Sequence, residues 1–165
     1  MNNNLKFEFS VNKENNTVHV QREFAADLAT VWKAWTTAEI LDQWWAPKPY
    51  RAETKSLDFK VGGSWLYAMV SPENEKHWCK ANYKSIAEKQ QFSYTDAFTD
   101  ENGEVTAEFP GSHWTNTFSD AGDKTLVDIV IKHDSLADLE KIIEMGFKEG
   151  FTAGLANLDE VLAAR

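Results

Sequence analysis

Residues 145–164 read MGFKEGFTAGLANLDEVLAA and close a chain of 165 residues. Their apolar side chains recur at helical spacing: Phe147, Phe151, Leu155, Leu158 and Leu162. This spacing predicts one long amphipathic helix from about residue 146 to residue 164. A shorter apolar face over residues 136–143 predicts a separate short helix just before it. The long helix has one apolar face, which the rest of the chain has to cover.

Residues 50–132 alternate apolar and polar side chains between turn signals, a pattern typical of strands. We expect strands at about 51–59, 64–70, 77–87, 91–98, 105–109 with 114–118, and 125–132. The short connections favour an antiparallel meander. A hairpin within residues 5–22 and two short helices, capped by Asp27 and Thr37, precede these strands. The order predicts an α+β fold in which a strongly bent antiparallel sheet wraps around the C-terminal helix.

Length and composition favour a single domain over residues 1–165. The 26 acidic and 17 basic residues give a net charge of −9, which argues against nucleic acid as a partner. The sequence has no apolar run long enough for a membrane span and no export signal at its start, so we expect a cytoplasmic protein. Cys79 is the lone cysteine, which excludes an internal disulfide, and its strand-like surroundings indicate a core residue.

Three sequence blocks carry a family resemblance. The first is VWKAWT at 31–36, followed by QWWAP at 43–47; the second is DFKVGGSW at 58–65; the third is MGFKEGF at 145–151. In this order they resemble the Activator of Hsp90 ATPase homologue 1-like (AHSA1-like) domains of the START-like superfamily, also called SRPBCC or Bet v 1-like. The resemblance covers roughly residues 17–164, although Lys60 stands where arginine is commoner.

The resemblance implies a helix-grip fold, in which the sheet and the long helix enclose a cavity. The superfamily binds lipids, hormones, polyketides and other apolar small molecules. Eukaryotic relatives carry an additional N-terminal Hsp90-binding domain, which these residues do not contain, so an Hsp90 interaction is doubtful. The resemblance implies no single activity.

Alternation along the strands indicates which side chains share a face with the cavity. The candidate lining residues are Trp35, Trp65, Tyr67, Met69, Tyr83, Tyr94, His113, Trp114, Phe118, Phe147, Gly150, Phe151 and Gly154. These aromatic side chains either fill the core of a bent sheet or line a partly open pocket. Both interpretations stay open at this stage.

Glycines and tryptophans offer further alternatives. Gly146, Gly150 and Gly154 recur every four residues, which indicates either close approach of the helix to the sheet or room for a ligand. The Gly62–Gly63 pair favours a sharp strand turn. Trp44 and Trp45 either pack under the sheet edge, which we favour, or form an exposed patch that would make a homodimer plausible.

The sequence contains none of the common motifs for nucleophilic, metal or nucleotide chemistry. Its four histidines are scattered, and His113 beside Trp114 is the one best suited to a cavity mouth. We therefore expect a binding module for a hydrophobic or amphipathic small molecule, with no catalytic residues, no metal and no cofactor. One alternative is a cyclase, dehydratase or lyase that uses His113, Tyr67, Tyr94 or Asp96 for proton transfer. Another is a stress protein that interacts with a chaperone.

Overall fold

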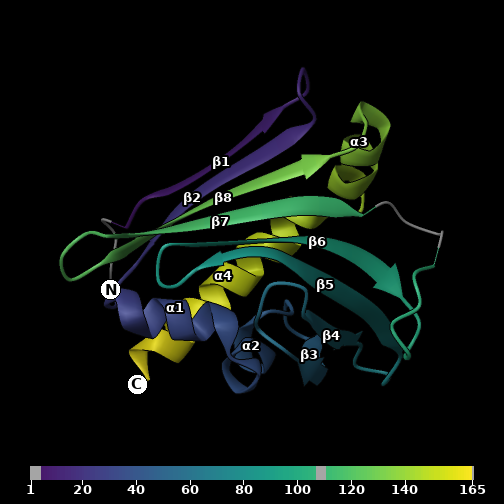
Figure 1. Ribbon diagram of the computed structural model, residues 1–165, viewed down its shortest axis with the longest axis horizontal. Coiled ribbons are helices and arrows are strands. Elements are labelled where there is room, and N and C mark those ends of the chain that lie inside the picture. Colours follow the sequence, from purple (N-terminus) through teal and green to yellow (C-terminus); the bar gives the residue numbers. More distant parts are fainter. Residues whose placement is uncertain (1–4, 107–110, 165) are drawn as a thin grey trace.

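Eight strands form one antiparallel sheet in the order β1-β2-β8-β7-β6-β5-β4-β3, and four helices accompany it (Figure 1). The computed structural model describes residues 5–106 and 111–164. The strands are β1 Phe7–Asn12, β2 Thr17–Phe24, β3 Arg51–Leu57, β4 Ser64–Val70, β5 Lys76–Ala87, β6 Gln91–Thr99, β7 Ser112–Asp120 and β8 Thr125–His133. The helices are α1 Leu28–Thr36, α2 Ala38–Trp44, α3 Leu136–Glu144 and α4 Phe147–Ala163.

The predicted meander is confirmed for β3 to β8, where each strand pairs with the next. Beyond it, β2 pairs with β8, which adds the N-terminal hairpin to the sheet. In the region predicted as the 105–109 strand, Val105 forms only an isolated bridge to Thr99, and residues 107–109 lie outside the described residues. The next strand begins at Ser112, earlier than expected.

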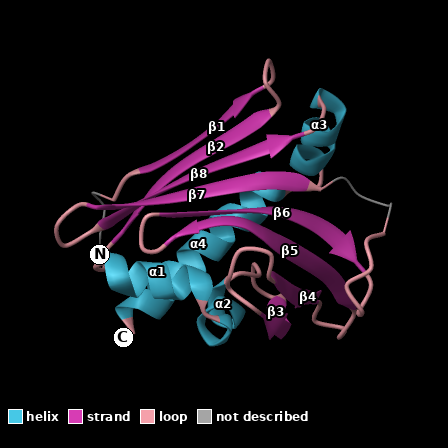
Figure 2. Cartoon of the chain, viewed as in Figure 1, coloured by secondary structure: helices cyan, strands magenta, loops and turns pink. Residues whose placement is uncertain are grey.

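Helices α1, α2 and α4 lie on one side of the sheet, whereas α3 lies at the end of β8 (Figure 2). Figure 2 shows α4 crossing the strands, with α1 and α2 near its C-terminal end and α3 near its start. Phe151, Leu155 and Leu158 of α4 belong to the same buried cluster as Val20, on β2. This arrangement is the helix-grip α+β fold that the sequence predicts.

Aromatic side chains of α1 fill the part of the inner face that this helix covers. The Trp32 ring lies 5.0 Å from Phe118 and 5.6 Å from Phe92, both in edge-on arrangements. The Trp35 ring lies 4.8 Å from Trp44, which is 1% exposed and donates its indole N–H to the Ala34 carbonyl. Packing of Trp44 is therefore confirmed, and the exposed tryptophan pair on which a homodimer was considered is absent.

Helix α4 is anchored at the end of α2. A Cβ atom at Gly154 would lie 3.2 Å and 3.3 Å from the carbonyl oxygens of Trp45 and Trp44. One turn along, the buried Asn157 amide donates to the Ala46 carbonyl at 3.0 Å and to the Trp44 carbonyl at 3.5 Å. The absence of a side chain at Gly154 thus permits close approach, but to the end of α2 rather than to the sheet.

The Gly62–Gly63 pair forms the predicted sharp turn between β3 and β4. Gly62 has a positive φ of 87°, and a Cβ at Gly63 would lie 2.2 Å from the Asp58 carbonyl oxygen. No side chain fits at Gly63 without a backbone shift. The turn therefore depends on glycine at this position.

Candidate ligand-binding cavity

A cavity of about 1160 Å³ lies between the inner face of the sheet and the α3–α4 end of the molecule. Strands β4 to β8 supply its base, and Phe147, Gly150 and Phe151 of α4 lie along its side. The segment after α2 closes another side with Trp45, Pro47 and Tyr50. The cavity therefore occupies the part of the inner face that α1 leaves uncovered.

The thirteen predicted lining residues divide into three groups. Six of them line the cavity: Tyr67, Met69, Trp114, Phe147, Gly150 and Phe151. Six lie in the packed core and outside the cavity lining: Trp35, Trp65, Tyr83, Tyr94, Phe118 and Gly154. For the second group the structure favours core packing, the other interpretation that the sequence left open.

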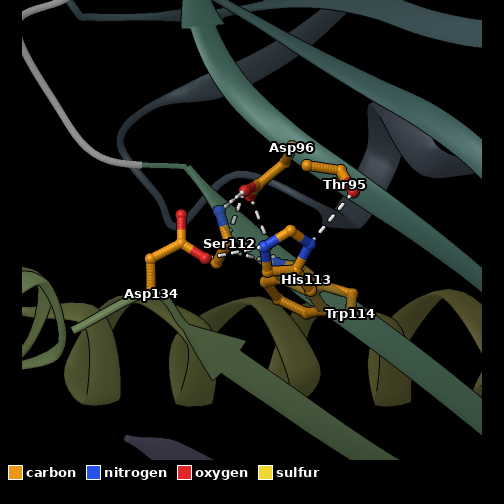
Figure 3. A network of polar contacts seen from close by, with 6 residues as sticks. All are labelled: Thr95, Asp96, Ser112, His113, Trp114 and Asp134. Atoms are coloured by element: carbon orange, nitrogen blue, oxygen red, sulfur yellow. Dashed lines mark hydrogen bonds and ion pairs between the residues drawn. The ribbon is translucent and has the colours of Figure 1, made fainter.

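His113 is on the wrong side of the sheet for the role considered. Its neighbours Ser112 and Trp114 are buried, so strand alternation turns His113 outward. The ring is half exposed and contacts the Thr95 hydroxyl at 3.2 Å and an Asp134 carboxylate oxygen at 3.0 Å (Figure 3). His113 is therefore an outer-surface residue and not a cavity residue.

The walls of the cavity are mainly aromatic. Phe147 and Phe151 stack on each other with ring centres 5.3 Å apart, one turn apart on α4. The Trp114 ring lies 5.6 Å from Phe151 and 5.9 Å from Trp45. On its other side Trp114 stacks on Tyr94 at 5.5 Å, which joins the cavity wall to the filled core.

Three polar residues on adjacent strands form what we call the polar row: Asp96 on β6, Ser112 on β7 and His133 on β8. Asp96 pairs with Ser112 in the strand register, and Ser112 pairs with His133. All three line the cavity. The row therefore places hydrogen-bonding groups at the base of the cavity, beside its aromatic walls.

Asp96 is held by its neighbours in the network drawn in Figure 3. One carboxylate oxygen accepts the Ser112 backbone N–H at 2.8 Å and the Ser112 hydroxyl at 2.7 Å. The other accepts the Trp114 indole N–H at 3.2 Å. Burial raises the pKa of Asp96 above its usual value, and these hydrogen bonds oppose that rise. Asp96 thus has the shifted pKa of a group removed from water.

His133 is 1% exposed, and neither ring nitrogen has a hydrogen-bond partner within the described part of the chain. Burial lowers the pKa of the ring. The negative charges of Asp138 and Asp134 act to raise that pKa, and the His113 ring acts to lower it further. The neutral ring carries one N–H donor and one acceptor nitrogen. A buried ring without hydrogen-bond partners normally reduces the free energy of unfolding. Here the ring lies in the wall of a cavity.

Tyr67 and Cys79 lie side by side on β4 and β5. The Tyr67 hydroxyl accepts the Trp45 indole N–H at 3.0 Å. Burial raises the pKa of the Cys79 thiol to about 12, and the nearby Asp96 charge adds to the effect. The predicted core placement of Cys79 is confirmed, since it is 9% exposed.

Several lining residues were missed from the sequence, and some of them carried a usable signal. His133 follows Ile129 and Ile131 at strand spacing, so alternation puts it on the buried face. Ser112 precedes Trp114 by two residues in the same way. Trp45, Pro47 and Tyr50 had no such signal, because they lie between elements.

Residues 5–106 and 111–164 contain no group of three or more histidine, cysteine or acidic side chains placed to hold a metal ion. Within the same residues, no helix combines the length and apolar character that crossing a membrane requires.

The fold and the cavity define a helix-grip domain of the START-like class. A family model described as "Activator of Hsp90 ATPase homolog 1-like protein" matches residues 25–163. The chain belongs to this family. No curated protein sequence matches it.

Solved structures of bacterial proteins share the fold over almost their whole length. A crystal structure from Mycobacterium smegmatis is 25% identical, with a TM-score of 0.88 and 98% of each chain covered. A solution structure from Arthrobacter aurescens is 26% identical, with a TM-score of 0.90 and coverage of 96% of this chain and 92% of that one. A solution structure from Staphylococcus epidermidis is 26% identical, with a TM-score of 0.83 and 94% of each chain covered.

The buried thiol leads to a first prediction. With a pKa of about 12, only about one Cys79 in ten thousand is a thiolate near pH 8. We expect the folded protein to react with a chromogenic disulfide reagent at least about a hundredfold more slowly than the denatured protein. The denatured chain, with its single cysteine, should release one equivalent and serves as the control. Rapid stoichiometric labelling of the folded protein would contradict the buried thiol.

The polar row leads to a second prediction, on stability and pH. Since the pKa of His133 is lowered from its ordinary 6.5 in the folded state, the unfolded chain takes up a proton first as the pH falls. The stabilisation that comes from a neutral His133 is therefore complete above about pH 6.5, and it is lost progressively as the pH falls below that value. Between about pH 7 and about pH 5, wild-type protein should lose more unfolding free energy in urea than His133→Gln.

The control for this comparison is His77→Gln, because His77 is exposed near the cavity mouth. It should lose stability with pH as the wild type does. Equal pH dependence of the wild type and His133→Gln would show that the folded state admits a charged ring at residue 133.

Proposed function

We propose that this protein binds a hydrophobic or amphipathic small molecule in the cavity and releases it chemically unchanged. The observation that carries the proposal is the cavity itself, with its volume of about 1160 Å³ and its aromatic walls. Ligand pockets are typically about 300–1,000 Å³, mostly apolar, with a few polar groups that fix orientation. The polar row supplies such groups.

The aromatic walls give a ligand a source of binding free energy. Phe147 is only partly buried although it stacks on Phe151, and Trp45 is likewise partly buried. An apolar molecule in the cavity would remove these ring surfaces from water, at roughly 25 cal/mol per Å² of apolar area. Filling the cavity is therefore favourable without any specific reaction.

The chemistry of the lining supports binding over covalent catalysis. The Cys79 thiol is a poor nucleophile because burial raises its pKa to about 12. The Ser112 hydroxyl donates to Asp96 at 2.7 Å, and the His133 ring, which has no hydrogen-bond partner among the described residues, is not bonded to it as an activating histidine would be.

One observation favours a second candidate, an enzyme that uses general acid–base catalysis. Asp96 lies in a cavity, and burial raises its pKa above the ordinary value, as in many catalytic carboxyl groups. An aromatic or polyketide-like substrate that exchanges a proton with Asp96 would fit this environment.

A third prediction tests cavity binding. Gly150 lines the cavity, and a Cβ there would make only an ordinary 3.8 Å contact with Pro47. A leucine at this position projects into the space that a ligand needs, so Gly150→Leu should weaken binding of an environment-sensitive naphthalene dye about tenfold or more. Ala156→Leu adds the same side chain at an exposed position of α4 and should bind the dye as the wild type does.

Native mass spectrometry should also show less co-purifying small molecule in Gly150→Leu than in Ala156→Leu. Equal dye binding and equal mass excess in the two variants would refute a ligand in this cavity.

A fourth prediction separates binding from catalysis. The co-purified molecule, extracted and incubated with fresh protein, should be recovered with unchanged mass and chromatographic retention. Conversion to a new product by wild-type protein, with loss of that conversion in Asp96→Asn, would establish the enzyme instead.

A further inference from the structure

The charged groups of the cavity lining are predominantly acidic. Among the described lining residues, Asp96, Asp100 and Glu101 are carboxylates, Lys76 is the lysine, and His77 and His133 are histidines. The Lys76 ammonium contacts Glu53 at 2.8 Å and lies over the Trp78 ring, so its charge is already compensated. An anionic ligand would meet acidic groups here without a free cation among the described lining residues.

The polar row has unused acceptor capacity. Both Ser112 donors bond to one oxygen of Asp96, whereas the other oxygen accepts only the 3.2 Å bond from Trp114. A carboxylate has about four acceptor positions, so this second oxygen can accept further donors. The neutral His133 ring adds an acceptor nitrogen. The base of the cavity therefore suits a ligand that brings N–H donors.

The walls beside Asp96 favour a positive charge. Trp114 donates its indole N–H to Asp96 and presents its ring to the cavity, with Phe151 5.6 Å away. Aromatic faces attract organic cations by about 0.5–2 kcal/mol, more when the cation is out of water. A buried carboxylate next to such faces is a suitable site for an ammonium group.

We propose that the ligand is an amphipathic organic amine whose ammonium group donates to Asp96. Its apolar part lies against Trp114, Phe147 and Phe151, and His133 accepts a second donor from its polar end. This inference rests on the proposed function, because it specifies the ligand class of the same cavity. It distinguishes an amine from a fatty acid, which shares the apolar part but carries the opposite charge.

A fifth prediction uses three probes with the same alkyl chain: decylamine, decanol and decanoate. Titrations followed by tryptophan fluorescence near neutral pH and physiological salt should show decylamine binding about tenfold or more tightly than decanol. Decanoate should bind more weakly than decanol, because its charge is repelled by Asp96.

Two variants test the origin of the preference. Asp96→Asn should lower decylamine affinity to about the affinity for decanol, and a far-UV circular dichroism spectrum equal to that of the wild type would report that the variant is folded. Glu101→Gln removes the same charge at an exposed position of the lining and should keep most of the preference, since exposed charges are screened.

The outcomes separate this inference from the proposed function. If decanol or decanoate binds as tightly as decylamine, the amine inference fails and the cavity function stands. If all three fail to bind and no molecule co-purifies, the proposed function fails as well. If Asp96→Asn does not fold, the order of the three probes on wild-type protein still decides the inference.

Discussion

The contact between α4 and the end of α2 sets the position of α4 on the sheet. The last carbonyl groups of a helix lack partners within that helix, and here the Asn157 amide donates to two carbonyl groups, those of Trp44 and Ala46. Gly154 allows the approach, because any side chain there would press on the same backbone. This contact fixes α4 along its axis. Phe151 and Phe147, one and two turns earlier, are thereby held against the uncovered part of the sheet.

One end of the inner face is filled and the other contains the cavity, because the helices cover the two ends with side chains of different volume. Under α1, Trp32 contacts Phe92 and Phe118 edge-on, so little space is left for anything else. At the other end, α3 contributes Ile142 to the lining and no comparable aromatic wedge. Trp114 lies at the boundary, stacked on Tyr94 of the core and in edge-on contact with Phe151 of the cavity wall. One protein thus contains a packed aromatic core and an aromatic-walled cavity on the same sheet.

The sequence predicts helices and strands with local periodicity well. It predicts poorly whether an inward-facing side chain is packed in the core or lines the cavity. The strands and the long helix follow from spacings of two and of three to four residues. Pairing of β2 with β8 joins segments about a hundred residues apart, and no local pattern encodes it. Strand alternation excludes His113 from the cavity lining once Trp114 is taken to face inward. It also places His133 on the same inner face as Ile131. The volume filled by Trp32 and Trp35 depends on the packed structure and lies beyond such reasoning.

The polar row is the part of the cavity that stability alone does not explain. A buried polar group without a partner costs about 1–3 kcal/mol, and an apolar residue at either end of the row would avoid that cost. Asp96 offsets it through three hydrogen bonds, whereas His133 has none among the described residues. Both face the end of the sheet that α1 leaves uncovered, where a bound molecule can supply the missing partners. Under the proposed function, the apolar walls would supply affinity and the polar base would select the head group, and both features follow from one arrangement of helices on the sheet.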